Sequence, residues 1–380
     1  MTEANTLRLP DGRLHRMSVP SIASGDFEPL RSRVIYAAAH VIADPLADNG
    51  PGRLATVDWD ATLAFRRHLW SHGLGVAEAM DTAQRGMGLD WPTARELIMR
   101  SSAEADGPLA CGVNTDQAAP ATLPEVIAAY EEQLEFVEAV DAGPILMCSR
   151  ALAAVATGAD DYRTVYNRLL GQVKRPVILH WLGPMFDPAL TGYWGSTDLP
   201  EAADTLLDII AANERSVDGV KISLLDADAE IAFRRRLPAS VKCYTGDDFN
   251  YPQLIAGDDQ GYSHALLGIF DPLAAKAASA VRRLDVGDVD GFRAELDPTV
   301  TLARKIFEKP TYHYKTGVVF LAWLCGHQNH FRMVNGSEAA RSIPHLVEVF
   351  EHADAIGLFP NPELAAARMR NLLTMAGVTQ

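Results

Sequence analysis

Short apolar runs alternate with amphipathic stretches along most of the chain. Eight such runs predict strands, at residues 34–41, 73–80, 109–115, 143–148, 176–182, 217–223, 240–245 and 262–269. The stretches between them show helical patterns, at residues 58–71, 92–105, 123–140, 160–173, 199–215, 227–236 and 248–256. A regular alternation of strand and helix predicts an α/β fold with a parallel sheet.

The number of strand–helix units favours a closed barrel. Eight units over roughly 240 residues suit a (β/α)8 TIM barrel, which typically takes about 250 residues. A doubly wound open sheet is the alternative, but it usually carries a glycine-rich phosphate loop after its first strand. Residues 34–45 contain no glycine. We therefore predict a (β/α)8 TIM barrel at residues 33–271.

The chain extends beyond this barrel at both ends. Two short β-type segments flank Pro10-Asp11-Gly12, which predicts an N-terminal β-hairpin extension within residues 1–32. After residue 271 the pattern is helical, at residues 272–284, 288–306, 312–325, 337–351 and 362–376. Residues 272–380 are therefore expected to form a C-terminal helical extension.

Composition and charge narrow the class of protein. The formal net charge of −15 argues against a nucleic-acid-binding surface. The longest apolar run, Val318–Cys325, is far too short to span a bilayer, and residues 1–11 lack the apolar segment of a secretion signal. The four cysteines are scattered without a C-x-x-C pair, as in a reducing compartment. We expect a cytoplasmic protein that binds neither nucleic acid nor membrane.

Lys221 is the strongest candidate for chemistry. It lies in the predicted strand Val217–Ser223, where alternation places Val217, Gly219 and Ser223 on its face. A lysine directed into a space lined by small residues loses hydration, which lowers its pKa and leaves a neutral amine able to attack carbonyls. The alternative is a lysine that extends to water or pairs with an aspartate.

Other candidates follow from the rule that barrel chemistry lies at the carboxyl ends of the strands. His180 is the candidate proton shuttle. The candidate substrate-binding residues are Asp81, Thr82, Asn114, Thr115, Arg150, Trp181, Thr245, Gly246, Asp247 and His264. Asp248 is equally suited to capping the following helix.

Three motifs resemble the dihydrodipicolinate synthase and N-acetylneuraminate lyase superfamily of class I, Schiff-base-forming aldolases. Gly219-Val220-Lys221 resembles the strand with the Schiff-base lysine, and Thr245-Gly246-Asp247-Asp248 resembles the serine-glycine-aspartate-aspartate of the next strand. Residues 109–115 (LACGVNT) resemble the third strand of the superfamily. The resemblance covers about 300 residues, most closely to a bacterial offshoot with an N-terminal extension, and implies a homo-oligomer, a dimer or a tetramer.

The departures from this family concern the substrate. Its glycine-threonine-threonine-glycine-glutamate loop, which binds the keto-acid carboxylate, is matched by Asp81-Thr82-Ala83-Gln84-Arg85, so only one threonine is kept. This disfavours pyruvate, unless Arg85 or Arg150 supplies the missing donors. The proton-shuttling tyrosine of the fifth strand is matched by His180, and Trp181 beside it suggests an aromatic wall.

These observations predict a lyase, an aldolase or a dehydratase, which acts through an imine at Lys221 on a carbonyl compound, expected to be a sugar-derived keto compound. We expect neither a cofactor nor a metal. The loop at residues 183–199, with Phe186, Tyr193 and Trp194, is expected to cover the substrate. His327–Arg332 is interpreted as a polar helix end near the barrel mouth or a subunit interface.

Two other functions stay open from the sequence. The first is a metal-dependent sugar isomerase or epimerase on the same barrel, with His180 and His264 as ligands. The second is a non-catalytic barrel that serves as a binding module.

Overall fold

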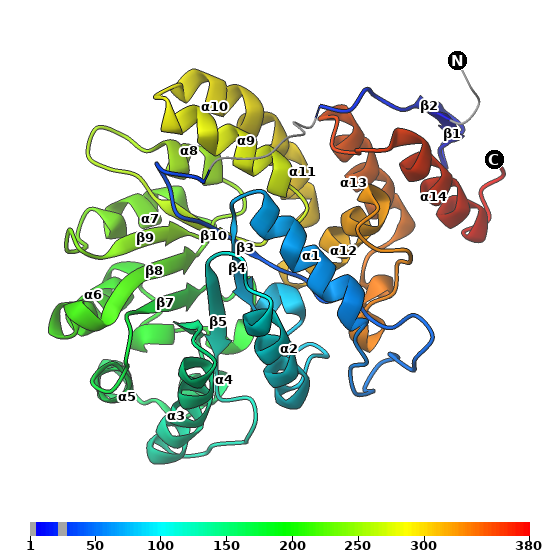
Figure 1. The fold of residues 1–380 in the computed structure, drawn as a ribbon. Helices are drawn as coiled ribbons and strands as arrows, with labels where there is room; N and C mark the ends of the chain where they lie inside the picture. The colour runs from blue at the N-terminus through cyan, green and yellow to red at the C-terminus, as the bar shows by residue number, and fades with distance from the viewer. Residues whose placement is uncertain (1–4, 22–28) are drawn as a thin grey trace.

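The strands form a closed parallel barrel in the order β10-β3-β4-β5-β6-β7-β8-β9 (Figure 1). The structure, a computed structural model, describes residues 5–21 and 29–380. The barrel strands are β3 (Ile35–Ala38), β4 (Gly75–Glu78), β5 (Leu109–Val113), β6 (Gly143–Leu146), β7 (Val177–Leu182), β8 (Val217–Ser223), β9 (Lys242–Thr245) and β10 (His264–Leu267). Each lies within a predicted strand, so the prediction of a (β/α)8 barrel is confirmed.

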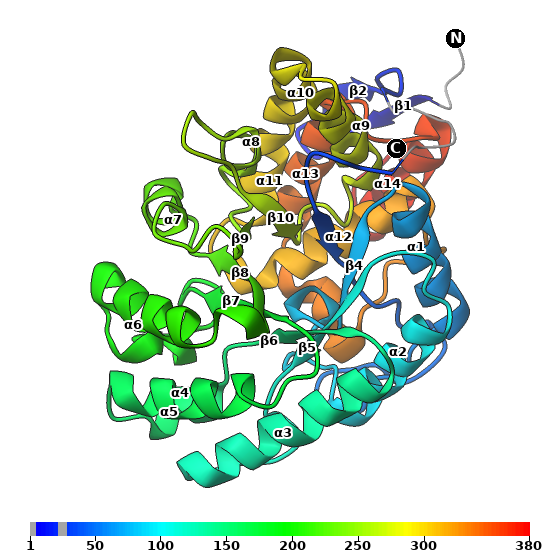
Figure 2. The same cartoon turned by 60° about the vertical axis from the view of Figure 1, so that its left-hand side comes forward.

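Helices surround this barrel, as the view turned by 60° also shows (Figure 2). They are α1 (Trp59–Ser71), α2 (Trp91–Ala103), α3 (Leu123–Ala139), α4 (Arg150–Val155), α5 (Ala159–Leu170), α6 (Leu199–Ala212), α7 (Ala227–Arg234) and α8 (Tyr251–Ala256). Side-chain caps begin most of them; Asp58, for example, accepts a hydrogen bond from the backbone of Ala61. The sequence did not predict α4, a helix of six residues that lies close before α5.

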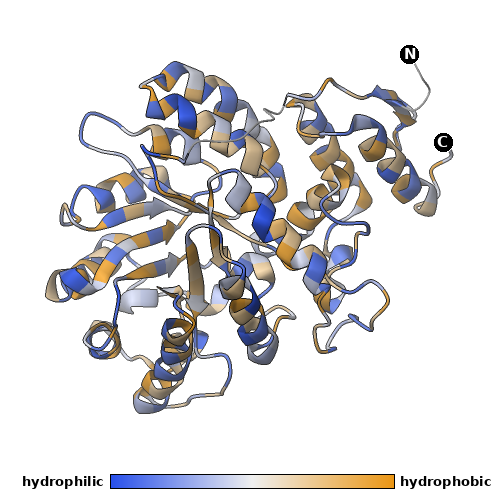
Figure 3. Ribbon diagram, in the orientation of Figure 1, coloured by the Kyte–Doolittle hydropathy of each residue, from blue (hydrophilic) through white to orange (hydrophobic). Residues whose placement is uncertain are grey.

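Hydrophobic side chains fill the layer between strands and helices, while the barrel interior holds a smaller cluster. The strands are coloured mainly as hydrophobic and the outer helices as mixed (Figure 3). The buried apolar residues of the interior include Ala38, Ala77, Ala110, Ile145, Ile178 and Leu266. Many of these side chains are small, which leaves space inside the barrel for longer polar side chains.

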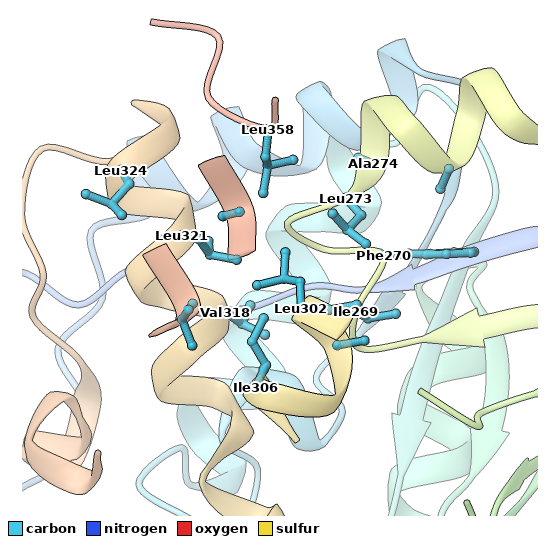
Figure 4. Close-up of a cluster of buried hydrophobic side chains, with 14 of the residues drawn as sticks. Ile269, Phe270, Leu273, Ala274, Leu302, Ile306, Val318, Leu321, Leu324 and Leu358 are labelled. Carbon is cyan, nitrogen blue, oxygen red and sulfur yellow. The ribbon is translucent and has the colours of Figure 1, made fainter. Parts of the chain in front are cut away.

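The C-terminal extension is a group of helices packed on one side of the barrel. Its helices are α9 (Ala274–Asp285), α10 (Val289–Leu296), α11 (Val300–Ile306), α12 (Tyr314–Cys325), α13 (Ile343–Ala355) and α14 (Pro362–Met375). The single helix predicted at residues 288–306 is interrupted by the 3-10 turn Asp297–Thr299. Ten of the twelve residues of α12 are buried. Val318 and Leu321 of α12 lie in one hydrophobic cluster with Leu302 and Ile306 of α11 and with Ile269, which follows β10 (Figure 4).

A buried polar contact joins this extension to the barrel. His40, which follows β3, lies with Nδ1 2.8 Å from Asp271 Oδ2 and with Nε2 3.1 Å from Gln328 Oε1. Gln328 belongs to the polar segment that ends α12. This segment therefore reaches the carboxyl end of β3, at the barrel mouth.

The N-terminal hairpin packs on the C-terminal helices. Its strands β1 (Thr6–Arg8) and β2 (Leu14–Arg16) pair antiparallel and lie beside α14 (Figure 1). Asp354 of α13 accepts a hydrogen bond from the backbone of Ser18. Part of the predicted extension at residues 1–32 falls outside the described residues.

Within residues 5–21 and 29–380, no helix combines the length and apolarity that crossing a bilayer requires.

Candidate active site

Lys221 points into the barrel from the carboxyl-terminal half of β8. It pairs in register with His180 of β7 and Tyr244 of β9, and its residue surface is only 7% exposed. Gly246 leaves room for the lysine, since a Cβ atom there would lie 3.0 Å from Lys221 Cε. Burial lowers the pKa of Lys221, while the charges of Asp81 and Asp248 oppose that decrease.

A β-bulge changes one detail of the predicted strand. Val177 pairs with Val217 and Ile178 pairs with Gly219, so Asp218 is an extra residue on β8. Val217 therefore packs with the helix-facing core, and its predicted position on the face of Lys221 is wrong. Gly219 and Ser223 lie beyond the bulge and keep the predicted alternation with Lys221.

His180 is fully buried next to Lys221. Its Nε2 lies 3.2 Å from Ser223 Oγ, and its Nδ1 has no hydrogen-bond partner in the described part of the chain. Burial, together with the positive charge of Lys221, holds the pKa of His180 well below its usual value. The imidazole is therefore neutral at physiological pH, a state that suits hydrogen bonding better than proton uptake.

A cavity of about 220 Å³ opens at this end of the barrel. Five predicted site residues line it together, namely Asp81, Asn114, Thr115, Arg150 and His180. Lys221 is not one of the lining residues; it lies on the strand next to His180. A substrate in this cavity would therefore reach the lysine past His180.

The arginines at the cavity differ in their availability. Arg85 is buried, and its guanidinium donates to Asp116 and Gln133 and to two backbone carbonyls. Arg150 is 56% exposed in its side chain, and its one ion pair within the described part of the chain is with Asp187, at 2.5 Å. Arg150 is therefore the arginine that can turn toward an anionic ligand, while Arg85 is saturated.

Two predicted site residues, Trp181 and Thr245, face away from the barrel interior. Trp181 packs edge-on against Phe233 of α7, with ring centroids 5.9 Å apart. Thr245 Oγ1 donates to Glu230 Oε2 at 3.0 Å. Trp181 follows the inward-facing His180, and Thr245 follows Tyr244, which belongs to the interior cluster. Because side chains alternate along a strand, Trp181 and Thr245 point toward the helices. The predictions that Trp181 forms an aromatic wall and that Thr245 binds substrate are wrong.

Asp247 and Asp248 serve local structure. Asp247 Oδ1 accepts hydrogen bonds from the backbone of Phe249 and Asn250, so it holds the turn before α8 instead of binding substrate. Asp248 Oδ1 accepts from the backbone of Ile269, and burial raises its pKa to about 7. Asp248 does not cap α8, because Asn250 occupies the cap position.

His264 lies at the opposite end of the barrel from the cavity. It is the first residue of β10, and its Nδ1 accepts a hydrogen bond from the backbone of Val34 at 2.8 Å. The structure therefore does not bring His264 together with His180, and its predicted role in the site is wrong. In residues 5–21 and 29–380, no group of three or more His, Cys, Asp or Glu side chains is arranged to hold a metal ion.

Helix α12 adds two residues that sequence reasoning missed. Tyr314 is buried, and its hydroxyl lies 2.8 Å from Thr82 Oγ1. Lys315 is 5% exposed and donates to the carbonyl of Tyr312 at 3.1 Å. Burial lowers the pKa of Lys315 to about 8, although the negative charge of Asp81 acts to raise it. A lysine within a predominantly apolar helical pattern was the signal in the sequence.

The loop after β7 reaches the cavity through other residues than predicted. Tyr193 and Trp194 are buried against Tyr162 and Tyr166 of α5, so their rings are not free to stack on a sugar. The loop instead lines the cavity with Asp187 and Leu190.

The fold and the site together define a (β/α)8 barrel protein with a buried amine near the carboxyl ends of its strands. Solved structures share this fold. Dihydrodipicolinate synthase from Aquifex aeolicus matches with a TM-score of 0.66 and 14% identity, covering 87% of this chain and 100% of that chain. A putative dihydrodipicolinate synthetase from Pseudomonas aeruginosa matches with a TM-score of 0.66 and 15% identity, covering 85% of this chain and 99% of that chain.

A third similar structure contains a bound keto acid. It is YagE, a prophage protein of the dihydrodipicolinic acid synthase family from E. coli K12, in complex with pyruvate. This structure matches with a TM-score of 0.67 and 13% identity, covering 86% of this chain and 99% of that chain. The chain itself belongs to the family described as protein of unknown function (DUF993), which it matches over residues 7–378. No curated protein matches its sequence. The predicted resemblance is thus confirmed for the fold, in a divergent family.

Proposed function

We propose that this protein is a Schiff-base-forming lyase, an aldolase or a dehydratase, that acts on a carbonyl compound through Lys221. The observation that carries the proposal is a buried lysine amine inside a barrel, near the strand ends, in a space that Gly246 keeps open. Desolvation favours the neutral amine, which is the nucleophilic form. The fold shared with dihydrodipicolinate synthases supports the same class of reaction.

The chemistry follows from the amine. Lys221 attacks the carbonyl carbon, water leaves, and the resulting iminium withdraws electrons from the neighbouring carbon. A C–C or C–O bond β to the original carbonyl carbon can then break or form. The neutral imidazole of His180 has one ring nitrogen in a hydrogen bond with Ser223, and it is suited to hold a substrate oxygen by a further hydrogen bond.

The cavity lining favours a hydroxylated substrate over pyruvate. Asn114 and Thr115 offer amide and hydroxyl groups, and Asp81 offers a carboxylate, which are suitable partners for sugar hydroxyls. A buried carboxylate without paired donors is costly, and Arg85 already has its full set of acceptors. We therefore propose a sugar-derived keto compound as substrate, with Arg150 as the residue available for an acidic group.

Borohydride trapping tests the proposal. The protein is incubated with borohydride and either pyruvate, a keto sugar or a sugar-derived keto acid, and its peptides are weighed. We expect the larger compounds to add their mass to the peptide with Lys221, and Lys221→Ala to abolish the adduct. Lys315→Met is the matched control, because it removes the other buried amine near Asp81 and should leave the Lys221 adduct in place.

Other outcomes would favour different functions. An adduct on Lys315 in place of Lys221 would contradict the assignment of the nucleophile, and efficient trapping of pyruvate alone would contradict the substrate class. Specific binding of a keto compound without any adduct would favour a binding module. The isomerase alternative required His180 and His264 to act together, and their positions at opposite ends of the barrel do not favour it. The homo-oligomeric state and the cytoplasmic location stay predictions.

A further inference from the structure

Thr115 brings a hydroxyl group to the wall of the cavity. It lies shortly after β5 and is only 3% exposed, and among the described residues that line the cavity it is the one serine, threonine or tyrosine. Cys148 lines the same cavity, but its thiol donates to the backbone carbonyl of His180 at 3.0 Å. Whether the Thr115 hydroxyl offers a substrate its hydrogen or its lone pairs depends on its own partners in the protein.

The partner of this hydroxyl is Ser149, which is fully buried. Thr115 Oγ1 lies 2.7 Å from Ser149 Oγ. Ser149 is the N-cap of α4, and its Oγ accepts a hydrogen bond from the backbone N–H of Leu152 at 3.0 Å. Its backbone N–H donates to the hydroxyl of Tyr193 at 3.1 Å, which also holds the residue in place. In the described part of the chain, Ser149 Oγ has no hydrogen-bond partner besides Thr115 and Leu152.

These contacts determine which of the two hydroxyls donates. A serine oxygen accepts at two lone pairs and donates one hydrogen. If Thr115 donated to Ser149, both lone pairs of the serine would be used and its hydrogen would be buried without an acceptor, which is unfavourable. If Ser149 donates to Thr115, no buried donor is left unpaired. The second arrangement is therefore favoured, and it leaves the hydrogen of Thr115 for a ligand in the cavity.

Asn114, which also lines the cavity, is oriented in the same sense. Its Oδ1 accepts a hydrogen bond from the backbone N–H of Thr115 at 2.8 Å, so its amide nitrogen is the group left for a ligand. Its backbone N–H donates to Oε1 of the buried Gln133 of α3 at 2.7 Å. Thr115 and Asn114 are thus adjacent neutral donors that the protein holds in place, which limits the entropy lost when a ligand binds.

We propose that Thr115 determines specificity by donating a hydrogen bond to a hydroxyl oxygen of the substrate, and that Ser149 positions its hydroxyl, an inference that rests on the function proposed above. A carboxylate is better matched by the charged Arg150, so the neutral donors are assigned to hydroxyl oxygens. A site built to bind a hydroxyl group rejects the analogue that lacks it. The wall therefore favours sugar-derived compounds over keto acids without hydroxyl groups.

Equilibrium binding of two acids without a ketone tests this role apart from imine formation. D-Gluconate and hexanoate have the same carbon chain and carboxylate, and only gluconate carries further hydroxyl groups. Calorimetry gives both dissociation constants for the wild type, Thr115→Val, Thr115→Ser and Ser149→Ala. The readout is the Kd of hexanoate divided by the Kd of gluconate, because a general distortion of the cavity weakens both acids alike and leaves this ratio unchanged.

The variants differ in the change that each should produce. We expect the wild type to prefer gluconate, and Thr115→Val to lower the ratio about tenfold, the effect of one lost hydrogen bond. Thr115→Ser keeps the hydroxyl and should keep most of the preference. In Ser149→Ala the Thr115 hydroxyl is free to rotate among three staggered positions, so the ratio should fall about threefold. If Thr115 instead donates to Ser149 in the wild type, Ser149→Ala releases its hydrogen and the ratio rises.

Asn361→Ala is the matched control for Ser149→Ala. Asn361 caps α14 by accepting a hydrogen bond from the backbone of Leu364 at 3.0 Å, and it is exposed and does not line the cavity. Its loss should lower stability as the loss of any cap does, with the ratio unchanged. A wild type that binds gluconate no better than hexanoate would overturn the proposal, as would an unchanged ratio in Thr115→Val or a higher one in Ser149→Ala.

Borohydride trapping of the corresponding keto acids, 2-keto-D-gluconate and 2-ketohexanoate, separates this role from the proposed lyase. We expect the wild type to be trapped at Lys221 at lower concentrations of the hydroxylated compound, and Thr115→Val to lose that difference. If neither keto acid is trapped while gluconate binding depends on Thr115, the proposed lyase fails and the binding role of Thr115 stands. If Lys221 is trapped while the gluconate ratio does not change in Thr115→Val, the lyase stands and the role of Thr115 is overturned.

Discussion

Replacement of Gly246 by alanine should displace the amine of Lys221. Gly246 directly follows β9, and its backbone N–H donates to the carbonyl of Ile222 at 2.7 Å. A Cβ atom there would lie 2.2 Å from Ser223 Oγ, 2.8 Å from the carbonyl oxygen of Ile222 and 3.0 Å from Lys221 Cε. Non-bonded heavy atoms do not approach so closely, so the neighbouring groups must move.

The size of the effect follows from which neighbours can move. The Ser223 hydroxyl can rotate only by leaving His180, and the carbonyl of Ile222 moves only with β8 itself. Overpacking of this kind typically costs about 1–3 kcal/mol of unfolding free energy. Since β8 carries Lys221, a shift of roughly 1 Å in the amine should also slow imine formation by about a hundredfold.

Urea unfolding and the rate of borohydride trapping measure the two effects. The control is Gly143→Ala at the start of β6, where the nearest atom to an added Cβ is the carbonyl oxygen of Leu109 at 3.4 Å, an ordinary contact. This control should change neither quantity appreciably. Combining Gly246→Ala with Ser223→Ala removes the closest contact and should recover part of the stability. A Gly246→Ala protein with the stability and trapping rate of the wild type would refute the reasoning.

Two further predictions concern residues in the layer between the strands and the helices, Glu230 of α7 and Trp181 of β7. Burial raises the pKa of Glu230 to about 8, so Glu230 is protonated in the folded protein at neutral pH and ionised in the unfolded chain. Its contribution to the unfolding free energy should therefore fall by about 1.4 kcal/mol per pH unit as pH rises from about 4 to 8. Urea unfolding at pH 5, 6 and 7 measures this slope, which Glu230→Gln should remove. Equal slopes of unfolding free energy against pH in the wild type and the variant would contradict this. Trp181→Ala should lower the unfolding free energy by about 3–5 kcal/mol while KM changes little, because the ring packs on Phe233 outside the cavity; a large rise in KM with unchanged stability would return Trp181 to the site.

The sequence determined the barrel because strands and helices leave local signals. Each observed barrel strand lies inside a predicted one, and β8 matches its prediction at both ends. Period-two alternation also oriented Lys221, Gly219 and Ser223 correctly. The same alternation could have excluded Trp181, since the neighbour of an inward-facing His180 must face the helices. The bulge at Asp218 left no such signal, because it depends on how β7 pairs with β8.

Only the tertiary structure decided which polar residues meet. Asp81, Lys221 and Lys315 come from three distant segments, and no local pattern relates the turn after β4 to the start of α12. The carboxylates of the cavity also look alike in sequence, yet Asp116 and Asp187 are paired with arginines and Asp81 is not. Local periodicity specifies the secondary structure and the side of each strand or helix to which a side chain points. Contacts between distant side chains, and the burial that shifts their pKa values, arise only when the barrel closes and the C-terminal helices pack on it.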